Sequence, residues 1–249
     1  MKKSIFTLVV VCFAMSVAAA EMPNQGFGVH MGWAQTVMRL NSPNTDFPKD
    51  SLANTIHLHG FKVGVVYDAS YIAGFGSTIG INYTFGTSNT KWAKEQTKMG
   101  FANYSERYQY LYNEVELFVD WQYKFEVAKE TYLILYTGPS LQLGATYTTR
   151  YERRNDATDE VTTSVINHYD KHEEIESNID LNRLNVTWGV GAGFQYRRYF
   201  LRGGYDFGLI NPHRNKQFVY PDGNTTTRNT RGRIDQWSIK LGIYLWYGN

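Results

Sequence analysis

The 249-residue sequence has little cysteine, little proline and no long apolar run after its first 20 residues. Its one cysteine, Cys12, lies in the N-terminal apolar stretch, so the rest of the chain has no disulfide, thiolate metal site or cysteine nucleophile. No later segment approaches about 18 consecutive apolar residues, which excludes a transmembrane helix there. The 22 glycines and the 16% of aromatic residues, beside only 6 prolines, instead indicate many β-strands.

The sequence also lacks an excess of charge of either sign. The formal net charge is +2, and the first two cations are Lys2 and Lys3. Without residues 1–20, 23 basic side chains face 23 acidic ones. Because binding to nucleic-acid phosphates needs a clear basic excess, this balance argues against nucleic acid as a partner.

Residues 1–20 have the three parts of a secretory signal peptide. Lys2 and Lys3 form the basic start, residues 5–14 form an apolar core too short to span a bilayer, and small residues end at Ala20. The sequence therefore predicts export with cleavage after Ala20, followed by one β-domain over residues 21–249.

Period-two alternation of apolar and non-apolar residues recurs in eight segments and predicts eight strands. Their predicted bounds are 27–37, 56–67, 73–86, 108–123, 132–147, 184–196, 199–209 and 235–247. In the last of these, Trp237, Ile239 and Leu241 share one face, while Ser238 and Lys240 lie on the other.

The connections between these strands alternate in length. Those at 68–72, 124–131 and 197–198 are short, whereas the others are long: 38–55, 88–107, 148–183 and 210–233. This pattern is typical of an eight-stranded antiparallel up-and-down transmembrane β-barrel of the outer membrane, with the short turns on the periplasmic side. A soluble lipocalin-type barrel is the rival fold, but the glycine-rich second face suits a crowded interior better than a solvent coat.

Charged residues on the non-apolar face are predicted to point into the lumen. They are Lys62, Glu114, Glu116, Asp120, Arg202, Asp206 and Lys240. One interpretation is a proton or ion path or a gate; the other is a set of paired charges that fills a narrow barrel, and we favour the second because an unpaired buried charge is costly. We expect Lys62, Arg202 and Lys240 to neutralise the carboxylates on 108–123 across the lumen.

Aromatic residues near strand ends on the apolar face predict two belts at the membrane interfaces. The residues assigned to them are Trp33, Tyr83, Trp121, Tyr123, Tyr147, Tyr196, Tyr199, Trp237 and Tyr247.

Two histidine pairs are candidates for metal sites, His57 with His59, and His168 with His172 beside Glu173 and Glu174. We expect interfacial and solvated histidines instead, and no metal or cofactor. Ser140 and His30 are the candidates for the Ser–His–acid set of a lipid-active enzyme, but neither has the sequence setting of a catalytic residue. The sequence therefore predicts no catalytic residue and no enzyme.

The long connections are the other place for function. Loop 148–183 is rich in tyrosine and charge, and loop 210–233 is biased towards arginine and lysine. They are candidates for binding an external protein or glycan, and the basic bias also fits the anionic groups of lipopolysaccharide. The alternative is a mobile hydrophilic fringe, and loop length alone does not decide between the two.

The signal sequence, the eight alternating segments and the aromatic last strand, Trp237 to Tyr247, together resemble the small outer-membrane β-barrel family, the OmpA-like and PorT-like barrels of the Bacteroidota type. The resemblance covers residues 26–247 and rests on architecture. It implies a barrel of the bacterial outer membrane in a family of diverse roles. Together with the lumen charges and the long loops, we expect a monomer with a plugged lumen and a structural or binding role through its external loops. A lipid-active enzyme and a narrow channel are the alternatives.

Overall fold

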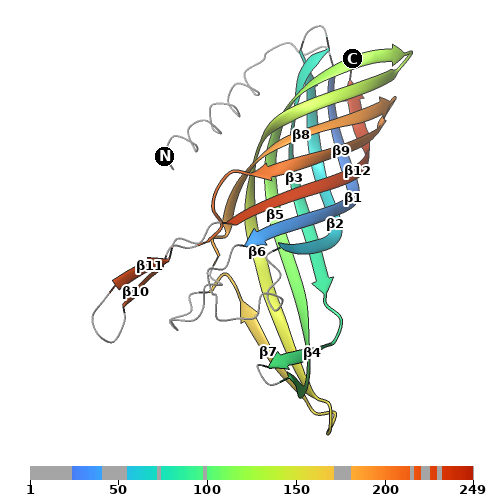
Figure 1. The fold of residues 1–249 in the computed structure, drawn as a ribbon. Coiled ribbons are helices and arrows are strands. Elements are labelled where there is room, and N and C mark those ends of the chain that lie inside the picture. The colour runs from blue at the N-terminus through green and yellow to red at the C-terminus, as the bar shows by residue number, and fades with distance from the viewer. Residues whose placement is uncertain are drawn as a thin grey trace.

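The computed structural model describes residues 24–40, 55–71, 74–97, 100–170, 181–213, 216–219, 225–228 and 232–248. Within them, eight antiparallel strands close into an up-and-down barrel in which the first strand pairs with the last (Figure 1). The barrel strands are β1 (Asn24–Leu40), β2 (Thr55–Ser70), β3 (Phe75–Asn89), β5 (Gly100–Ala128), β6 (Thr131–Asn155), β8 (Leu184–Tyr196), β9 (Tyr199–Gly208) and β12 (Gly232–Gly248). The predicted fold is thereby confirmed.

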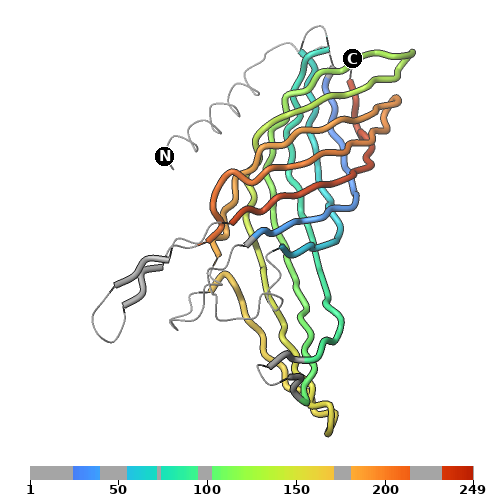
Figure 2. Tube along the Cα trace, viewed as in Figure 1, coloured from blue at the N-terminus to red at the C-terminus, as the bar shows by residue number. Residues whose placement is uncertain are grey.

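Four further strands lie in segments that were predicted as loops. They are β4 (Ala93–Thr97), β7 (Val161–Asn167), β10 (Lys216–Val219) and β11 (Thr225–Arg228). β4 pairs with β5 and β7 with β6, while β10 and β11 pair with each other. The first two form because β5 and β6 continue past their barrel neighbours and offer free backbone edges, which local sequence does not reveal (Figure 2).

Alternation along the barrel strands produces an apolar outside and a polar inside. Large apolar side chains stand exposed on the outer face, among them Met31 at 63%, Phe61 at 67% and Leu241 at 60%. Their neighbours in sequence, such as Lys62 and Lys240, are buried within the ring. This arrangement is the reverse of a soluble barrel, and it suits a surface that faces lipid.

The position of Tyr147 differs from the prediction, which placed it on the outer face at the membrane interface. Asn113 pairs with Thr146 but Glu114 pairs with Gly144, so Ala145 is an extra residue in β6. This β-bulge shifts the alternation by one residue. Tyr147 therefore points inward, where it is only 1% exposed.

Tyr247 is a second correction of the same kind. Phe27 pairs with Trp246 but Gly28 pairs with Tyr244, which leaves Leu245 as a bulge in β12. Beyond the bulge Trp246 is exposed on the outside, and Tyr247 packs against Tyr244 at the inner end of the lumen. A pattern read from sequence assumes an unbroken period of two, and each bulge breaks it.

The remaining predicted interface aromatics follow the outward alternation. Tyr83, Tyr196 and Tyr199 are exposed, and Trp33, Trp121, Tyr123 and Trp237 are partly exposed. The predicted signal peptide and its cleavage site lie outside the described residues. Among the residues that the structure describes, no helix is long and apolar enough to cross a membrane.

Close backbone packing at Gly32 provides a test of the fold. A Cβ atom added to Gly32 would lie 1.9 Å from the carbonyl oxygen of Ile239, whereas at Gly203 the nearest atom would be 3.8 Å away. We expect Gly32→Ala to lower the free energy of unfolding by about 1–3 kcal/mol, because overpacking forces the backbone to shift. A urea titration followed by the gel mobility of unheated samples measures this. Gly203→Ala is the matched control, and equal stability of the two variants would contradict the packing described here.

Candidate functional site

The charged residues that were predicted to point into the lumen all lie on the inner wall of the barrel. Lys62, Glu114, Glu116, Asp120, Arg202 and Lys240 are all buried, and Asp206 is partly exposed. They come from β2, β5, β9 and β12, whose inward positions face one another across a narrow ring. The interior is therefore crowded with charge, and its stability depends on how each group is paired.

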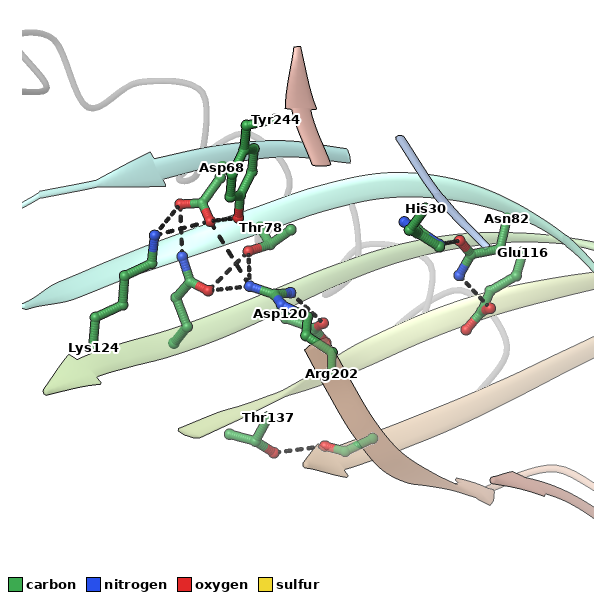
Figure 3. A network of polar contacts seen from close by, with 12 residues as sticks. His30, Asp68, Thr78, Asn82, Glu116, Asp120, Lys124, Thr137, Arg202 and Tyr244 are labelled. Atoms are coloured by element: carbon green, nitrogen blue, oxygen red, sulfur yellow. Dashed lines mark hydrogen bonds and ion pairs between the residues drawn. The ribbon is translucent and has the colours of Figure 1, made fainter. Parts of the chain in front are cut away.

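One cluster is centred on Glu116. Lys62 Nζ donates a hydrogen bond to Glu116 Oε2 at 2.6 Å, and Asn82 Nδ2 donates to the same oxygen at 2.8 Å. His30 in turn bonds the Asn82 side-chain oxygen at 2.7 Å. The chain of contacts joins β1, β2, β3 and β5, and Lys62 and Glu116 are both almost fully buried. Figure 3 shows its His30, Asn82 and Glu116 members.

The second cluster is centred on Asp68, which the sequence had placed in a turn. Its carboxylate lies 3.0 Å from Lys124 Nζ and accepts hydrogen bonds from Gln122 Nε2 at 2.8 Å and from the Tyr244 hydroxyl (Figure 3). Lys124 was also assigned to a turn. Both residues continue the inward-facing alternation of their strands, Asp68 after Lys62 and Val66, and Lys124 after Asp120 and Gln122. Extending the predicted alternation by a few residues would therefore have placed both of them in the lumen.

Arg202 joins this cluster to the middle of the lumen. Its guanidinium lies 3.8 Å from both Asp68 and Asp120, and it donates to Thr78 Oγ1 at 2.8 Å. The guanidinium also stacks over the ring of Tyr136 at 5.2 Å. One arginine therefore bridges two carboxylates, as its planar fork of donors allows.

Glu114 and Lys240 are not paired as expected. Glu114 accepts hydrogen bonds from the Tyr112 hydroxyl at 2.6 Å and from Gln236 Nε2 at 2.7 Å, so its hydrogen bonds come from neutral donors. Lys240 lies over the ring of Phe118 at 5.2 Å. Lys240, Glu116, Asp120 and Asp206 line a cavity of about 10 Å³, close to the size needed for one water molecule.

Two apolar clusters lie in the lumen. In one, Tyr244 packs with Phe200, Phe118 and Val66, and it lies between the Glu116 and Asp68 clusters along β5 and β2. At the outer mouth, a larger cluster contains Met38, Ile56, Leu58, Tyr110, Tyr112, Tyr147, Tyr169, Leu181 and Ile234. Apolar packing thus separates the two polar clusters from each other and fills the outer mouth.

Parts of the long connections fold back over the outer mouth. His168 stacks on Tyr147 with ring centroids 4.2 Å apart and bonds Thr149 Oγ1 at 2.6 Å. Leu181 forms a β-bridge with His213. Burial lowers the pKa of His213 and raises the pKa of Tyr169, because both charged forms lose solvation in this cap. The sequence marked His168 only as a candidate metal ligand, and it did not mark Leu181 or His213, because their partners lie far away in the chain.

The candidate metal and catalytic residues that the structure describes contact different partners. Gln35 Nε2 lies 3.1 Å from His57 and 3.4 Å from His59 on the outer surface. Ser140 bonds Thr187 on the neighbouring strand, whereas His30 bonds Asn82. Within the described part of the chain, no group of three or more His, Cys, Asp or Glu side chains is placed to hold a metal ion; His172, Glu173 and Glu174 lie outside it.

A second candidate site lies on the extension, by which we mean β4, β7 and the parts of β5 and β6 that run beyond their barrel neighbours. On its outward face, Arg107 donates from Nε to Glu152 at 2.9 Å, and Trp92 lies against Arg107 and Arg154, 4.7 Å and 5.0 Å from their guanidinium carbons. The same face lower on β5 carries Val115 and Leu117. The change from apolar to charged residues marks where the membrane ends.

The inward face of the extension is a ladder of tyrosines, which we call the tyrosine ladder: Tyr104, Tyr108, Tyr110, Tyr112, Tyr147 and Tyr151. Tyr108 and Tyr151 lie opposite each other, with ring centroids 5.2 Å apart. Arg153 lies 4.0 Å over the ring of Tyr104, and the Tyr151 hydroxyl donates to Glu106. Tyr112 and Tyr147 are buried in the mouth, while Tyr104, Tyr108 and Tyr151 remain partly exposed.

No protein-family model matches the sequence, and no curated protein does. Ail, the attachment invasion locus protein of Yersinia pestis, is similar in structure, with 8% identity over 90% of this chain and 99% of that chain and a TM-score of 0.36. Neisserial surface protein A has 12% identity over 89% and 99%, with a TM-score of 0.35.

A major outer membrane protein from Thermus thermophilus is also similar, with 12% identity over 87% of this chain and 99% of that chain and a TM-score of 0.37. Likeness at this level carries no information about function. The geometry of the chain itself defines its class, a small membrane-spanning β-barrel with a polar interior.

The Lys62–Glu116 pair provides a test of the lumen. We expect Lys62→Met to lower the free energy of unfolding by about 3–5 kcal/mol, because Glu116 is left buried without its cation. Adding Glu116→Gln should recover most of the loss. Urea titration of the protein in detergent measures both. Arg197→Gln, which breaks an exposed pair with Glu130, is the control and should leave the stability nearly unchanged. A Lys62→Met variant as stable as the unaltered protein would show that the pair is not needed.

Proposed function

We propose that the protein is a monomeric barrel of the bacterial outer membrane that does not conduct and that binds a ligand outside the cell through its extension. It is exported by the signal peptide at residues 1–20, its long-loop end faces outward, and lipopolysaccharide surrounds it in the outer leaflet. We also propose that it is not an enzyme and that it belongs with the OmpA-like and PorT-like barrels of the Bacteroidota type.

The packing of the lumen supports a closed barrel. Hydrogen bonds connect opposite walls, from Gln236 on β12 to Glu114 on β5 and from Arg202 on β9 to Thr78 on β3. A cavity beside Glu116 and Asp206 has a volume of only about 10 Å³. Hydrated ions need a continuous path that is much wider than one water molecule. A filled interior also explains the buried charges structurally, since an eight-stranded barrel has room for little besides side chains.

The observation that carries the binding role is the extension itself. β5 runs from Gly100 and β6 runs to Asn155, well past the ends of β3 and β8 (Figure 1). A turn is enough to connect two neighbouring strands of a membrane barrel. An ordered sheet with a partly exposed tyrosine face at such a connection therefore indicates a function beyond linking the strands. Tyrosine offers large contact area with little side-chain entropy to lose, which is why it is frequent in binding surfaces. An external protein or glycan is the ligand class that this face suits.

A recording in a planar lipid bilayer tests the closed lumen. We expect purified protein to give no steady, large conductance, because the two polar clusters and the two apolar clusters fill the interior. The double variant Lys62→Ala/Arg202→Ala, which removes two long side chains from the lumen, should raise conductance if it still folds. A large steady current from the unaltered protein would refute the closed barrel.

Substitution of the exposed part of the tyrosine ladder tests the binding role. The purified protein is titrated against a panel of soluble polysaccharides and extracellular proteins. For any ligand found, we expect Tyr104→Ala/Tyr108→Ala/Tyr151→Ala to bind at least about tenfold more weakly, since truncating an aromatic anchor commonly costs about 2 kcal/mol or more at a binding surface. Tyr196→Ala/Tyr199→Ala at the opposite rim is the control. Equal binding by the triple variant would place the ligand elsewhere.

A further inference from the structure

Two arginines face each other on the outer surface of the barrel, where β1 and β12 reach its long-loop end. Arg39 and Arg233 are directly paired in the register of these strands. Like charges opposite each other in a sheet destabilise it unless something lies between them. Here the side chain of Asp235, two residues further along β12, lies between the two guanidinium groups.

The geometry of this cluster leaves an excess of one positive charge. Arg39 Nη1 binds the Asp235 carboxylate directly, and Arg233 Nε binds it at 2.9 Å. The Tyr205 hydroxyl and the Gly208 backbone N–H each donate to the same carboxylate at 3.0 Å. Asp235 is completely buried, whereas the Arg39 and Arg233 side chains are 42% and 47% exposed. One carboxylate thus orients two cations whose outer edges remain accessible.

An aromatic surface lies directly below this cluster. Trp33 packs edge-on against Trp237, with ring centroids 4.3 Å apart, and stacks on His59 at 5.6 Å. Gln35 connects the two levels: its side-chain oxygen accepts from the indole N–H of Trp237, and its nitrogen lies close to His59. Tryptophans in this position lie at the level of the lipid headgroups.

The depth of the cluster follows from the strands themselves. Below Trp33 and Trp237, the outward faces of β1 and β12 carry exposed Met31, Ile239 and Leu241, which belong to the lipid-facing band. Moving outward, the sequence of levels is therefore apolar, then aromatic, then a pair of arginines. In a bilayer this order places the guanidinium groups at the height of the phosphates, beside lipid rather than in open solvent.

We propose that Arg39 and Arg233 bind a phosphate group of an outer-leaflet lipid, of the kind that lipid A carries on its sugars. Guanidinium groups bind phosphate through two parallel N–H donors, and Asp235 holds both groups in place before binding. The tryptophans below provide a surface for the sugar and the first part of the acyl chains. Free phosphate would gain only the charge contacts, which favours the lipid as the source. This inference rests on the outer-membrane location proposed above.

The test measures the binding of lipid by the full mature protein in detergent. Diphosphoryl lipid A and the same lipid without phosphates are titrated separately, with retention followed by native mass spectrometry and with inorganic phosphate as a third ligand. We expect at least about tenfold tighter binding of the diphosphoryl form. Arg39→Gln/Arg233→Gln/Asp235→Asn, which removes both cations without leaving a buried carboxylate unpaired, should abolish this preference.

The single variant Asp235→Asn distinguishes a lipid-binding role of the two arginines from a purely structural role, in which they only hold β1 and β12 together through Asp235. The asparagine keeps one acceptor oxygen between the arginines but removes the charge that neutralises one of them, so the preference for the phosphorylated lipid should increase several-fold. A clamp without a binding role predicts only lower stability. Arg197→Gln is the matched control, because Arg197 is also an exposed, ion-paired arginine beside an interface tyrosine, but at the opposite rim. The Arg197→Gln variant should prefer the diphosphoryl lipid to the same extent as the unaltered protein does.

The outcomes distinguish this inference from the proposed function. Equal affinity of the unaltered protein for the two lipids, or complete displacement of lipid A by millimolar inorganic phosphate, overturns the lipid site. If the protein still fractionates with the outer membrane in that case, the proposed location remains valid although the lipid site does not. Recovery of the mature protein in the soluble periplasm would instead overturn the proposed function, whatever the lipid titration shows.

Discussion

Closure of the sheet between β1 and β12 is the constraint on which the rest of the structure depends. The two strands pair along their whole length, from Gln25 with Gly248 to Leu40 with Gly232. In a bilayer no water replaces a missing backbone hydrogen bond, so a sheet can span only as a closed ring. Closing so few strands leaves a narrow lumen, and its inward side chains must then pack and pair with one another. The ion pairs around Asp68 and Glu116 follow from that requirement.

The same alternation has a different consequence where β5 and β6 leave the ring. The outward face no longer meets lipid, and it changes from valine and leucine to arginine and glutamate. The inward face no longer meets an opposite wall, and it carries the tyrosine ladder from the apolar mouth to a partly exposed surface. One pair of strands therefore spans the membrane and projects beyond it, and the outer arginines of β1 and β12 lie at the boundary between the two environments.

Much of the fold could be predicted because its determinant is local. An apolar residue at every second position requires only that one face of a strand meets lipid, and all eight barrel strands were found within a few residues of their ends, apart from the long extension of β5 and β6. Tyr147 and Tyr247 were misplaced because an inserted residue, Ala145 or Leu245, reverses the phase without leaving a mark in composition. Asp68 and Lys124 were assigned to turns because charged residues near a strand end resemble loop residues.

By itself, the sequence determined the number of barrel strands, which face of each is apolar, and which charged residues point inward, since each of these follows from a repeat along one strand. Only the tertiary structure decided which charges meet: Glu114 is stabilised by Tyr112 and Gln236, and Asp68 becomes the centre of a cluster. Partners across a barrel are set by the stagger of strands far apart in sequence, and a shift of one residue exchanges them. The tyrosine ladder and the Arg39–Asp235–Arg233 cluster exist for the same reason, because each is assembled by register between strands.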